Sequence, residues 1–283
     1  MEERLISAEI ISRYQTYLAE EEKSPATVEK YIRDVTAFSS YLNEEKEEMS
    51  KETVIGYKQH LREEGYAIRS INSMLASLNS LFAFLGWEDL KVRALKLQQE
   101  VFRPEEKELT REEYERLCRT AQKRHNEWLS LILQTICSTG IRVSELPFIT
   151  VAAVKSGSAL VSLKGKTRSV FLPKPLQKKL LRYIKEQKIT EGYVFITCSG
   201  KPLSRTNIWR EMKSLCEEAK VAPRKVYPHN LRHLFARIFY HLEKDIMKLA
   251  DVLGHSSVNT TRIYIISTGL EHRRCMEKMH LVI

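Results

Sequence analysis

Apolar side chains recur every three or four residues in four successive segments of the first hundred residues. After Ser24 and Pro25 this spacing continues to Leu42, which is typical of a helix with one apolar face. Serine is a favoured N-cap and proline a favoured first helical residue, so we predict a helix over 25–42. The same spacing predicts three further helices, over 5–20, 51–64 and 68–85. The first part of the chain is therefore expected to fold as a unit of four helices.

A polar segment without apolar periodicity separates this unit from the rest of the chain. Residues 101–109 contain Pro104 and read as a linker. Thr110 and Glu113 then fit a capping box, which predicts the start of a new helix. We therefore expect an N-terminal domain over 1–100 and a second domain over 110–283.

The second part shows mixed patterns. Residues 128–138 predict an apolar helix that ends near Gly140. Segments 159–163 and 169–172 predict a β-hairpin with a basic tip at 164–168, and 192–197 predicts a short third strand. Further helices are expected over 205–219, 229–241, 244–253 and 256–266. The predicted fold class is mainly α: a four-helix domain, then a mixed, mostly helical domain with a small antiparallel β-sheet.

Composition narrows the class of protein. The chain has 283 residues, of which 43% are hydrophobic and 29% charged, a balance that favours a globular core over disorder. It lacks a long apolar run and an N-terminal signal pattern, so we expect no membrane span and no secretion. Its five cysteines form no CxxC pair. The predicted location is therefore the cytoplasm, with free thiols.

The positive charge is concentrated in the second part of the chain. The net charge is +10; residues 1–100 hold 13 basic and 18 acidic side chains, whereas 101–283 hold 33 and 18. Such a balance indicates a polyanionic partner, most often nucleic acid. A solvated basic surface with no partner is the alternative that charge alone leaves open.

Several kinds of site are not supported. Gly165, Lys166 and Thr167 resemble the end of a P-loop, but Leu160 stands where that motif needs glycine. His229 and His233 have the spacing of two metal ligands on a helix, yet no third ligand lies near them in sequence. No carboxylate cluster that could hold Mg²⁺ stands out in the basic part. We therefore predict no metal and no cofactor.

Four separated segments remain as candidate chemistry. Taken singly, each has an ordinary structural explanation, such as a surface arginine, a turn lysine, a helix-terminal histidine or a core tyrosine. The segments are Thr139-Gly-Ile-Arg142-Val-Ser-Glu145-Leu146, the hairpin tip with Lys166, His229-Asn-Leu-Arg232-His233, and Leu253-Gly-His255-Ser-Ser-Val-Asn-Thr-Thr-Arg-Ile-Tyr264.

Together and in this order, the four segments resemble the signature of the tyrosine recombinase family, which includes phage integrases and Xer-like enzymes. The four-helix unit resembles the core-binding domain of that family, so the resemblance covers nearly the whole chain. It implies a site-specific DNA recombinase that cuts and rejoins DNA through a 3′-phosphotyrosine, without ATP or metal. Integration, excision, inversion and resolution all remain open.

The resemblance also implies roles for named residues. Two guanidiniums can clamp the nonbridging oxygens of a phosphodiester and stabilise its transition state. Tyr264 would be the nucleophile, and His229 would assist removal of its proton. Lys166 would protonate the 5′-hydroxyl leaving group, with Lys164 as its competitor. The remaining assignments are the arginine clamp, a histidine bond to the phosphate and a carboxylate that supports the site: Arg142, Arg232, His255 and Glu145.

The expected partners follow from the same resemblance. They are double-stranded DNA with short inverted-repeat core sites and three further copies of the chain, which would form a tetramer around a Holliday junction. A second recombinase or an accessory DNA-bending protein is a further expectation. The candidate DNA contacts are Thr27, Arg69, Asn72, Lys201, Ser204 and Arg205. The C-terminal tail is expected to dock on a neighbouring protomer through Leu270, Cys275, Met276, Met279 and Leu281.

Two other functions share part of this pattern. A DNA-binding protein on a recombinase scaffold would bind without cutting, but binding alone does not need Tyr264. A relaxing activity like that of type IB topoisomerases would use the same chemistry. The N-terminal domain favours the recombinase.

Overall fold

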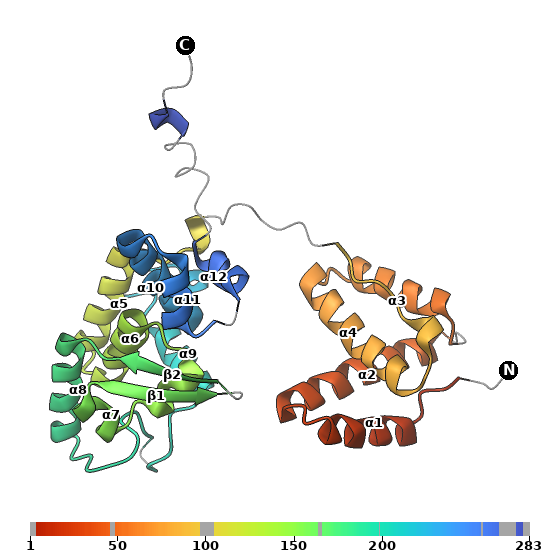
Figure 1. Ribbon diagram of the computed structural model, residues 1–283, viewed down its shortest axis with the longest axis horizontal. Coiled ribbons are helices and arrows are strands. Elements are labelled where there is room, and N and C mark those ends of the chain that lie inside the picture. Colours follow the sequence, from red (N-terminus) through yellow and green to blue (C-terminus); the bar gives the residue numbers. More distant parts are fainter. Residues whose placement is uncertain are drawn as a thin grey trace. The chain divides into compact units, whose positions relative to one another are not determined.

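The computed structural model describes residues 4–45, 49–96, 105–163, 166–197, 199–255, 257–265 and 276–279, and within these ranges not the side chains at positions 44, 45, 105, 163, 166 and 265. The chain divides into two compact units, Met1–Gln99 and Glu100–Ile283 (Figure 1). Most of the expected apolar face of the tail, at Leu270, Cys275 and Leu281, lies outside the described residues; Met276 and Met279 are exposed.

The first unit consists of four α-helices, as its periodicity predicts. They are α1 (Ala8–Glu20), α2 (Pro25–Glu45), α3 (Lys51–Glu63) and α4 (Ile68–Phe84). A 3₁₀ turn, η1 (Glu88–Leu90), follows α4. The Ser24 hydroxyl accepts a bond from the Thr27 amide at 3.3 Å at the start of α2, which confirms the predicted serine cap and proline start. The core is apolar, and α2 packs along α4.

The second unit is mostly helical. Its α-helices are α5 (Arg111–Lys123), α6 (Glu127–Thr139), α7 (Val151–Ser156), α8 (Lys174–Glu186), α9 (Arg205–Ser214), α10 (Pro228–Glu243), α11 (Ile246–Leu253) and α12 (Val258–Ile265). Its 3₁₀ helices are η2 (Glu105–Lys107), η3 (Val143–Phe148) and η4 (Pro223–Lys225). The predicted capping box at the start of α5 is present, with Thr110 and Glu113 bonded to each other's amides at 2.9 and 3.2 Å.

A two-stranded antiparallel sheet forms the expected hairpin. Strand β1 (Ser158–Leu163) pairs with β2 (Lys166–Phe171), and Val161 lies opposite Arg168. The predicted tip over 164–168 was too long, because the ladder extends to the pair of Leu163 and Lys166. Cross-strand hydrogen bonds thus place Arg168 inside the sheet rather than in a solvated turn.

Two other predictions need correction. The described residues of 192–197 make only isolated bridges, Thr150 with Tyr193 and Ile196 with Pro202, so the predicted third strand was wrong. Proline has no amide hydrogen with which to continue a ladder. The helix predicted over 205–219 ends at Ser214, where the backbone tightens into three-residue turns at residues 215 and 216.

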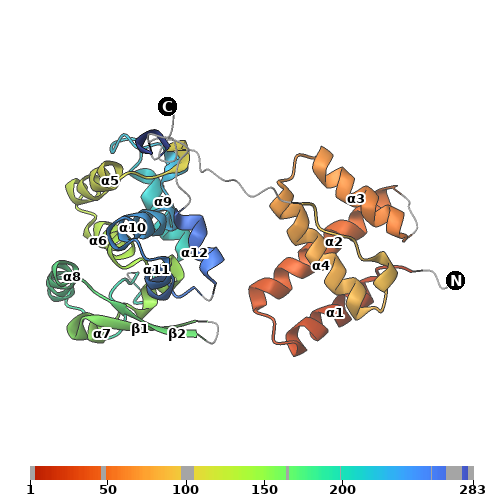
Figure 2. The same ribbon diagram turned by 45° about the horizontal axis from the view of Figure 1, so that its top comes forward.

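Helices α10, α11 and α12 form a compact corner of the second unit (Figures 1 and 2). Helix α10 packs against α6 on one side and against α11 and α12 on others. Ala236, Leu249, Leu253 and Tyr264 form a small buried cluster at this corner. The loops that leave α6 and α11 are thereby brought to the side of α10. None of the described helices is long and apolar enough to cross a membrane.

Candidate active site

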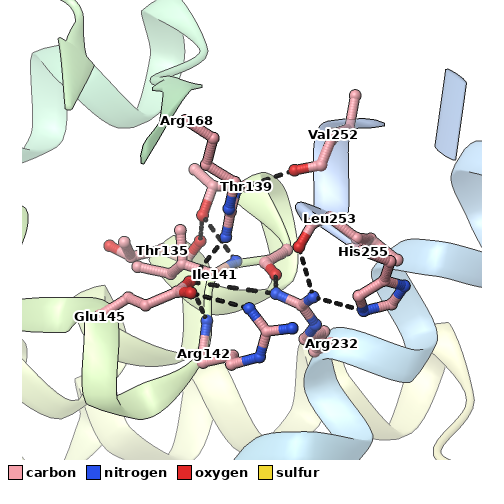
Figure 3. Close-up of polar contacts among 11 residues, drawn as sticks. Thr135, Thr139, Ile141, Arg142, Glu145, Arg168, Arg232, Val252, Leu253 and His255 are labelled. Carbon is pink, nitrogen blue, oxygen red and sulfur yellow. Dashed lines mark hydrogen bonds and ion pairs between the residues drawn. The ribbon is translucent and has the colours of Figure 1, made fainter. Parts of the chain in front are cut away.

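Segments around Arg142, Arg168 and His255, which are distant in sequence, meet beside Arg232 of α10 (Figure 3). Arg142 is the N-cap of η3, directly after the α6 terminus at Gly140. Arg232 lies in the second turn of α10, and His255 follows α11. Tyr264 lies in α12. The structure thus gathers five of the six residues expected to be catalytic, His229 at the start of α10 included.

A buried carboxylate holds Arg142 and Arg168. Glu145 is only 2% exposed; its carboxylate accepts the Arg142 amide at 2.8 Å, Arg142 Nη1 at 2.9 Å and Arg168 Nη2 at 2.6 Å. Residues three apart on a 3₁₀ helix lie on the same side, which brings Glu145 beneath Arg142. The Arg142 side chain stays 41% exposed, so it is anchored and still accessible to a ligand.

Arg232 is the most deeply buried charge of the site. Its side chain is 1% exposed, and its guanidinium donates to the carbonyls of Gly140 and, at 2.8 Å, Leu253. Its Nε has no hydrogen-bond partner in the described part of the chain. Burial, followed by the charge of Arg142, lowers the pKa of Arg232 to about 10, while Tyr264 and Glu145 act in the opposite direction.

The carbonyl of Gly140 depends on glycine. Gly140 ends α6 in the left-handed region, with φ of +67°, and a Cβ there would lie 2.5 Å from the Phe235 ring. A larger residue would strain the backbone and move the α6 terminus away from α10. The glycine before Ile141 and Arg142 therefore fixes an acceptor for Arg232.

His255 joins Arg232 to α12. Its Nε2 lies 2.9 Å from Arg232 Nη2 and its Nδ1 lies 2.8 Å from Thr261 Oγ1. A guanidinium only donates, so Nε2 accepts and the neutral ring carries its proton on Nδ1. Burial and then the charges of Arg232, Arg142 and Arg168 lower the pKa of His255 to about 4, which keeps it neutral near pH 7. For Nε2 to donate a hydrogen bond to a phosphate, the ring must therefore gain a second proton or move its proton from Nδ1 to Nε2, and Nε2 must give up its bond from Arg232.

The Tyr264 ring is 6% exposed and packs among three imidazoles. The ring centroid of His233 lies 4.2 Å away, His255 5.3 Å and His229 5.4 Å. The Arg232 guanidinium carbon lies 5.9 Å from the same ring. The expected nucleophile is thus held against the groups expected to assist it.

An open pocket of about 610 Å³ lies beside the start of α10. Its lining includes Arg142, Arg232 and His229, together with Arg205 and Trp209 of α9. Ser204 caps α9 by accepting the Asn207 amide at 3.1 Å, and Lys201 is exposed on the segment before it. Of the three DNA contacts predicted here, Lys201, Ser204 and Arg205, only Arg205 is among the residues that line the pocket. The pocket is therefore basic on two sides.

The three DNA contacts predicted in the first unit differ from one another. Arg69 is exposed on the first turn of α4. The Thr27 hydroxyl lies 2.8 Å from that of Ser24, at the start of α2. Asn72 exchanges two bonds with the backbone of Leu95, at 2.9 and 2.7 Å, which gives its amide a structural function in holding the segment after α4.

The remaining expected residue is only partly described. Lys166 is the first residue of β2, and its side chain and all of Lys164 lie outside the described residues. Sequence reasoning gave no role to Arg168, His233 or Thr261, although each stands inside a quoted segment. Their signal was adjacency: His233 follows Arg232, and Thr261 precedes Tyr264 by three residues.

Comparisons with known proteins identify the family of this chain. Residues 107–269 match the phage integrase family, and residues 11–89 match the N-terminal SAM-like domain of phage integrases. Tyrosine recombinase XerA of Pyrococcus furiosus is 30% identical over 291 residues, covering 100% of this chain and 98% of that protein. Tyrosine recombinase XerD of Halalkalibacterium halodurans is 28% identical, covering 90% and 91%.

Solved structures show the same fold. A lambda integrase fragment (75–356), crystallised as a dimer on a COC′ core site, has a TM-score of 0.74 at 17% identity, covering 92% of this chain and 95% of that chain. XerH bound to a difH substrate has a TM-score of 0.70 at 18% identity, covering 95% and 84%.

The fold and the arginine–histidine–tyrosine site define an enzyme that cuts and rejoins DNA. The chain belongs to the phage integrase family, and it is a tyrosine recombinase. The resemblance read from the sequence is thereby confirmed, as are the mainly α fold class and the activity in site-specific recombination.

Proposed function

We propose that this recombinase binds a scissile phosphodiester in the pocket beside α10, with Arg142 and Arg232 as its clamp and Tyr264 as its nucleophile. The observation that carries the proposal is the excess of positive charge around Glu145. Arg142 and Arg168 bond to this carboxylate, and Arg232 Nη1 lies 4.0 Å from it. Three guanidiniums share one carboxylate, so the cluster has charge left for an anion.

Nucleophilic attack increases the negative charge on the nonbridging oxygens of the phosphate. Preorganised guanidiniums stabilise this charge more strongly in the transition state than in the ground state. Arg142 and Arg232 both line the pocket, and the buried Nε of Arg232 has no hydrogen-bond partner among the described residues. His255 is already bonded to Arg232, and a bound phosphate would favour the protonated ring by offsetting the nearby positive charge.

The covalent step is a balanced exchange of esters. The Tyr264 Oη attacks phosphorus as His229 takes the phenolic proton, and the bond from phosphorus to the 5′-oxygen breaks. The leaving oxygen takes a proton, which we assign to Lys166. The bond energy is kept in the 3′-phosphotyrosine, so a second 5′-hydroxyl can reverse the step without ATP. Exchange of strands between two sites follows from this reversal.

The assembly we propose is a tetramer on two core sites that passes through a Holliday junction. A lambda integrase tetramer has been crystallised on such a junction, with a TM-score of 0.72 to this chain. Inverted-repeat core sites fit a protein that places one copy on each half-site. The basic balance of residues 101–283 fits phosphate contacts along both arms.

Covalent trapping tests the proposal. Nicked duplexes that tile the DNA flanking the gene would be incubated with the protein in EDTA without ATP, then separated on denaturing gels. We expect a protein–DNA adduct that is absent in Tyr264→Phe, although this variant still binds DNA. Tyr193→Phe, which alters a tyrosine of the second unit that is 43% exposed and outside the pocket lining, is the matched control and should still form the adduct.

The possible results separate the alternatives. An adduct that persists in Tyr264→Phe would overturn the assignment of the nucleophile. Salt-sensitive, sequence-specific binding without any adduct would instead favour a DNA-binding protein. Relaxation of supercoiled DNA without exchange between two sites would favour a topoisomerase-like activity.

A further inference from the structure

Arg168 connects the β-hairpin to the floor of the active site. From its place in β2 it donates through Nη2 to Glu145 Oε2 at 2.6 Å and through Nη1 to the carbonyl of Val252 at 2.8 Å (Figure 3). Its side chain is 14% exposed. One guanidinium thus joins the carboxylate that orients Arg142 to the end of α11 that precedes His255.

The surroundings of Arg168 are built around its side chain. Gly254 follows α11 with φ of +65°, and a Cβ at this position would lie 2.4 Å from Arg168 Cδ. Because Gly254 has no side chain, the space beside its Cα is filled by the Arg168 side chain. The planar guanidinium presents Nη1 to a carbonyl and Nη2 to a carboxylate in one fixed geometry, which the compact ammonium of lysine does not reproduce.

Arg168 lies in the same strand as Lys166, so its contacts with the active site also affect the position of Lys166. Arg168 stands two residues after Lys166 in the same strand, and its cross-strand partner is Val161. Strand β1 packs on η3. Arg168 bonds to the carbonyl of Val252 at the end of α11 and so connects β2 to the helix that precedes His255.

We propose that Arg168 is a positioning residue that docks the hairpin onto the active site, so that Lys166 is held at the leaving 5′-oxygen. It acts through the register of β2 and does not touch the phosphate. This inference rests on the proposed function of Lys166 as general acid. It predicts that loss of Arg168 impairs protonation of the leaving group more than it impairs nucleophilic attack.

A substrate with sulfur at the 5′-bridging position separates these two effects. Attack by Tyr264 then breaks a phosphorus–sulfur bond, and the electron pair leaves on a thiolate that needs no proton. Single-turnover cleavage rates would be measured on matched oxygen and sulfur substrates. Fluorescence anisotropy would report DNA affinity, and thermal unfolding would report folding.

We expect Arg168→Met to cleave the oxygen substrate about 100-fold more slowly than the unmodified enzyme, the order of loss that follows a small misplacement of a catalytic group. On the sulfur substrate, Arg168→Met should cleave at a rate within about fivefold of the unmodified enzyme, because the general acid is no longer required. On the oxygen substrate, the cleavage rate of Arg168→Lys should lie between those of Arg168→Met and the unmodified enzyme. Arg182→Met removes an arginine of α8 that is 65% exposed and should change neither rate.

Equal losses on both substrates would overturn the proposal, since Arg168 would then act on the phosphate clamp through Glu145. Unchanged rates on both would overturn it as well. If Arg168→Met does not fold, Arg168→Lys carries the same comparison. Lys166→Ala tests the proposed function separately. If the unmodified enzyme cleaves DNA and the sulfur substrate does not restore the cleavage rate of Lys166→Ala, Lys166 is not the general acid.

Discussion

Each unit of the molecule has a carboxylate that is at most 3% exposed, Asp34 in the first and Glu145 in the second, and the two have different surroundings. Asp34 in α2 is 3% exposed; it pairs with Lys30 and accepts the Ser77 hydroxyl of α4 at 2.8 Å. A second cation, Arg33, lies 3.5 Å away but is 72% exposed. The charge of Asp34 is therefore balanced by one partly buried cation, Lys30.

Around Glu145 the balance is broken. Arg142, Arg168 and Arg232 surround this carboxylate, and Arg232 and Glu145 are almost fully buried. Unpaired buried charge costs free energy in a ligand-free protein. A balanced cluster such as that of Asp34 serves the packing of α2 on α4, whereas an unbalanced one marks the place where an anion belongs. Charge balance therefore separates the structural site from the functional one.

Replacement of Arg232 should have the largest effect on catalysis. Arg232→Lys cannot reach the carbonyls of Gly140 and Leu253 together with His255. We expect cleavage to fall by about 1000-fold, as when one preorganised donor is removed from an anionic transition state. The matched change in the other cluster is Arg33→Lys, which should leave the cleavage rate unaltered. Single-turnover assays on a nicked duplex measure both, and a similar loss in both variants would contradict the comparison.

The two carboxylates themselves should differ in their response to anions. Glu145→Gln leaves three guanidiniums without a counterion, and we expect it to lower the unfolding free energy by about 3–5 kcal/mol. Asp34→Asn should cost about 1–3 kcal/mol, because Lys30 is partly solvated. Hydrogen exchange resolves the two units within the full chain. Sulfate should restore protection in Glu145→Gln and not in Asp34→Asn; equal recovery would show that charge balance does not separate the sites.

The pH dependence of stability should reveal the positive surroundings of His255. Its pKa is about 4 in the folded protein and 6.5 as an ordinary histidine. Between these values the unfolded chain takes up a proton that the folded chain does not, so stability falls as the pH falls from about 6.5 to 4. His255→Gln should reduce this slope in thermal unfolding between pH 7 and pH 4. An unchanged slope would contradict the assignment.

The smallest effects are expected in the first unit. Arg69→Ala should leave folding intact and reduce the slope of log affinity against log salt by about one, as expected for one lost phosphate contact. Asn72→Ala breaks the two bonds to Leu95 and should reduce hydrogen-exchange protection after α4 without changing that slope. DNA titrations at several salt concentrations distinguish them. A reduced slope in Asn72→Ala would return that residue to the DNA surface.

Local signals predicted most of the helices, because each depends on residues close together in the chain. The Ser24 and Thr110 caps and the apolar face of 25–42 are examples. Helices α7 and α8 escaped prediction. The pairing of the hairpin was underestimated, because strand ends depend on cross-strand bonds that no local pattern encodes. The third strand does not form, because Pro202 opposite Ile196 has no amide hydrogen with which to continue a ladder.

The sequence by itself determined the family and six residues to which the resemblance gives catalytic roles, because these residue types stand in a fixed order in recognisable strings. Only the tertiary structure showed how α10 brings the termini of α6 and α11 together, and that Arg168 joins Glu145 to Val252. It also showed that Asn72 is bound to Leu95. The physical reason is that these bonds span between 21 and 92 residues of chain. Such contacts depend on packing geometry, whereas motifs and caps are written in neighbouring residues.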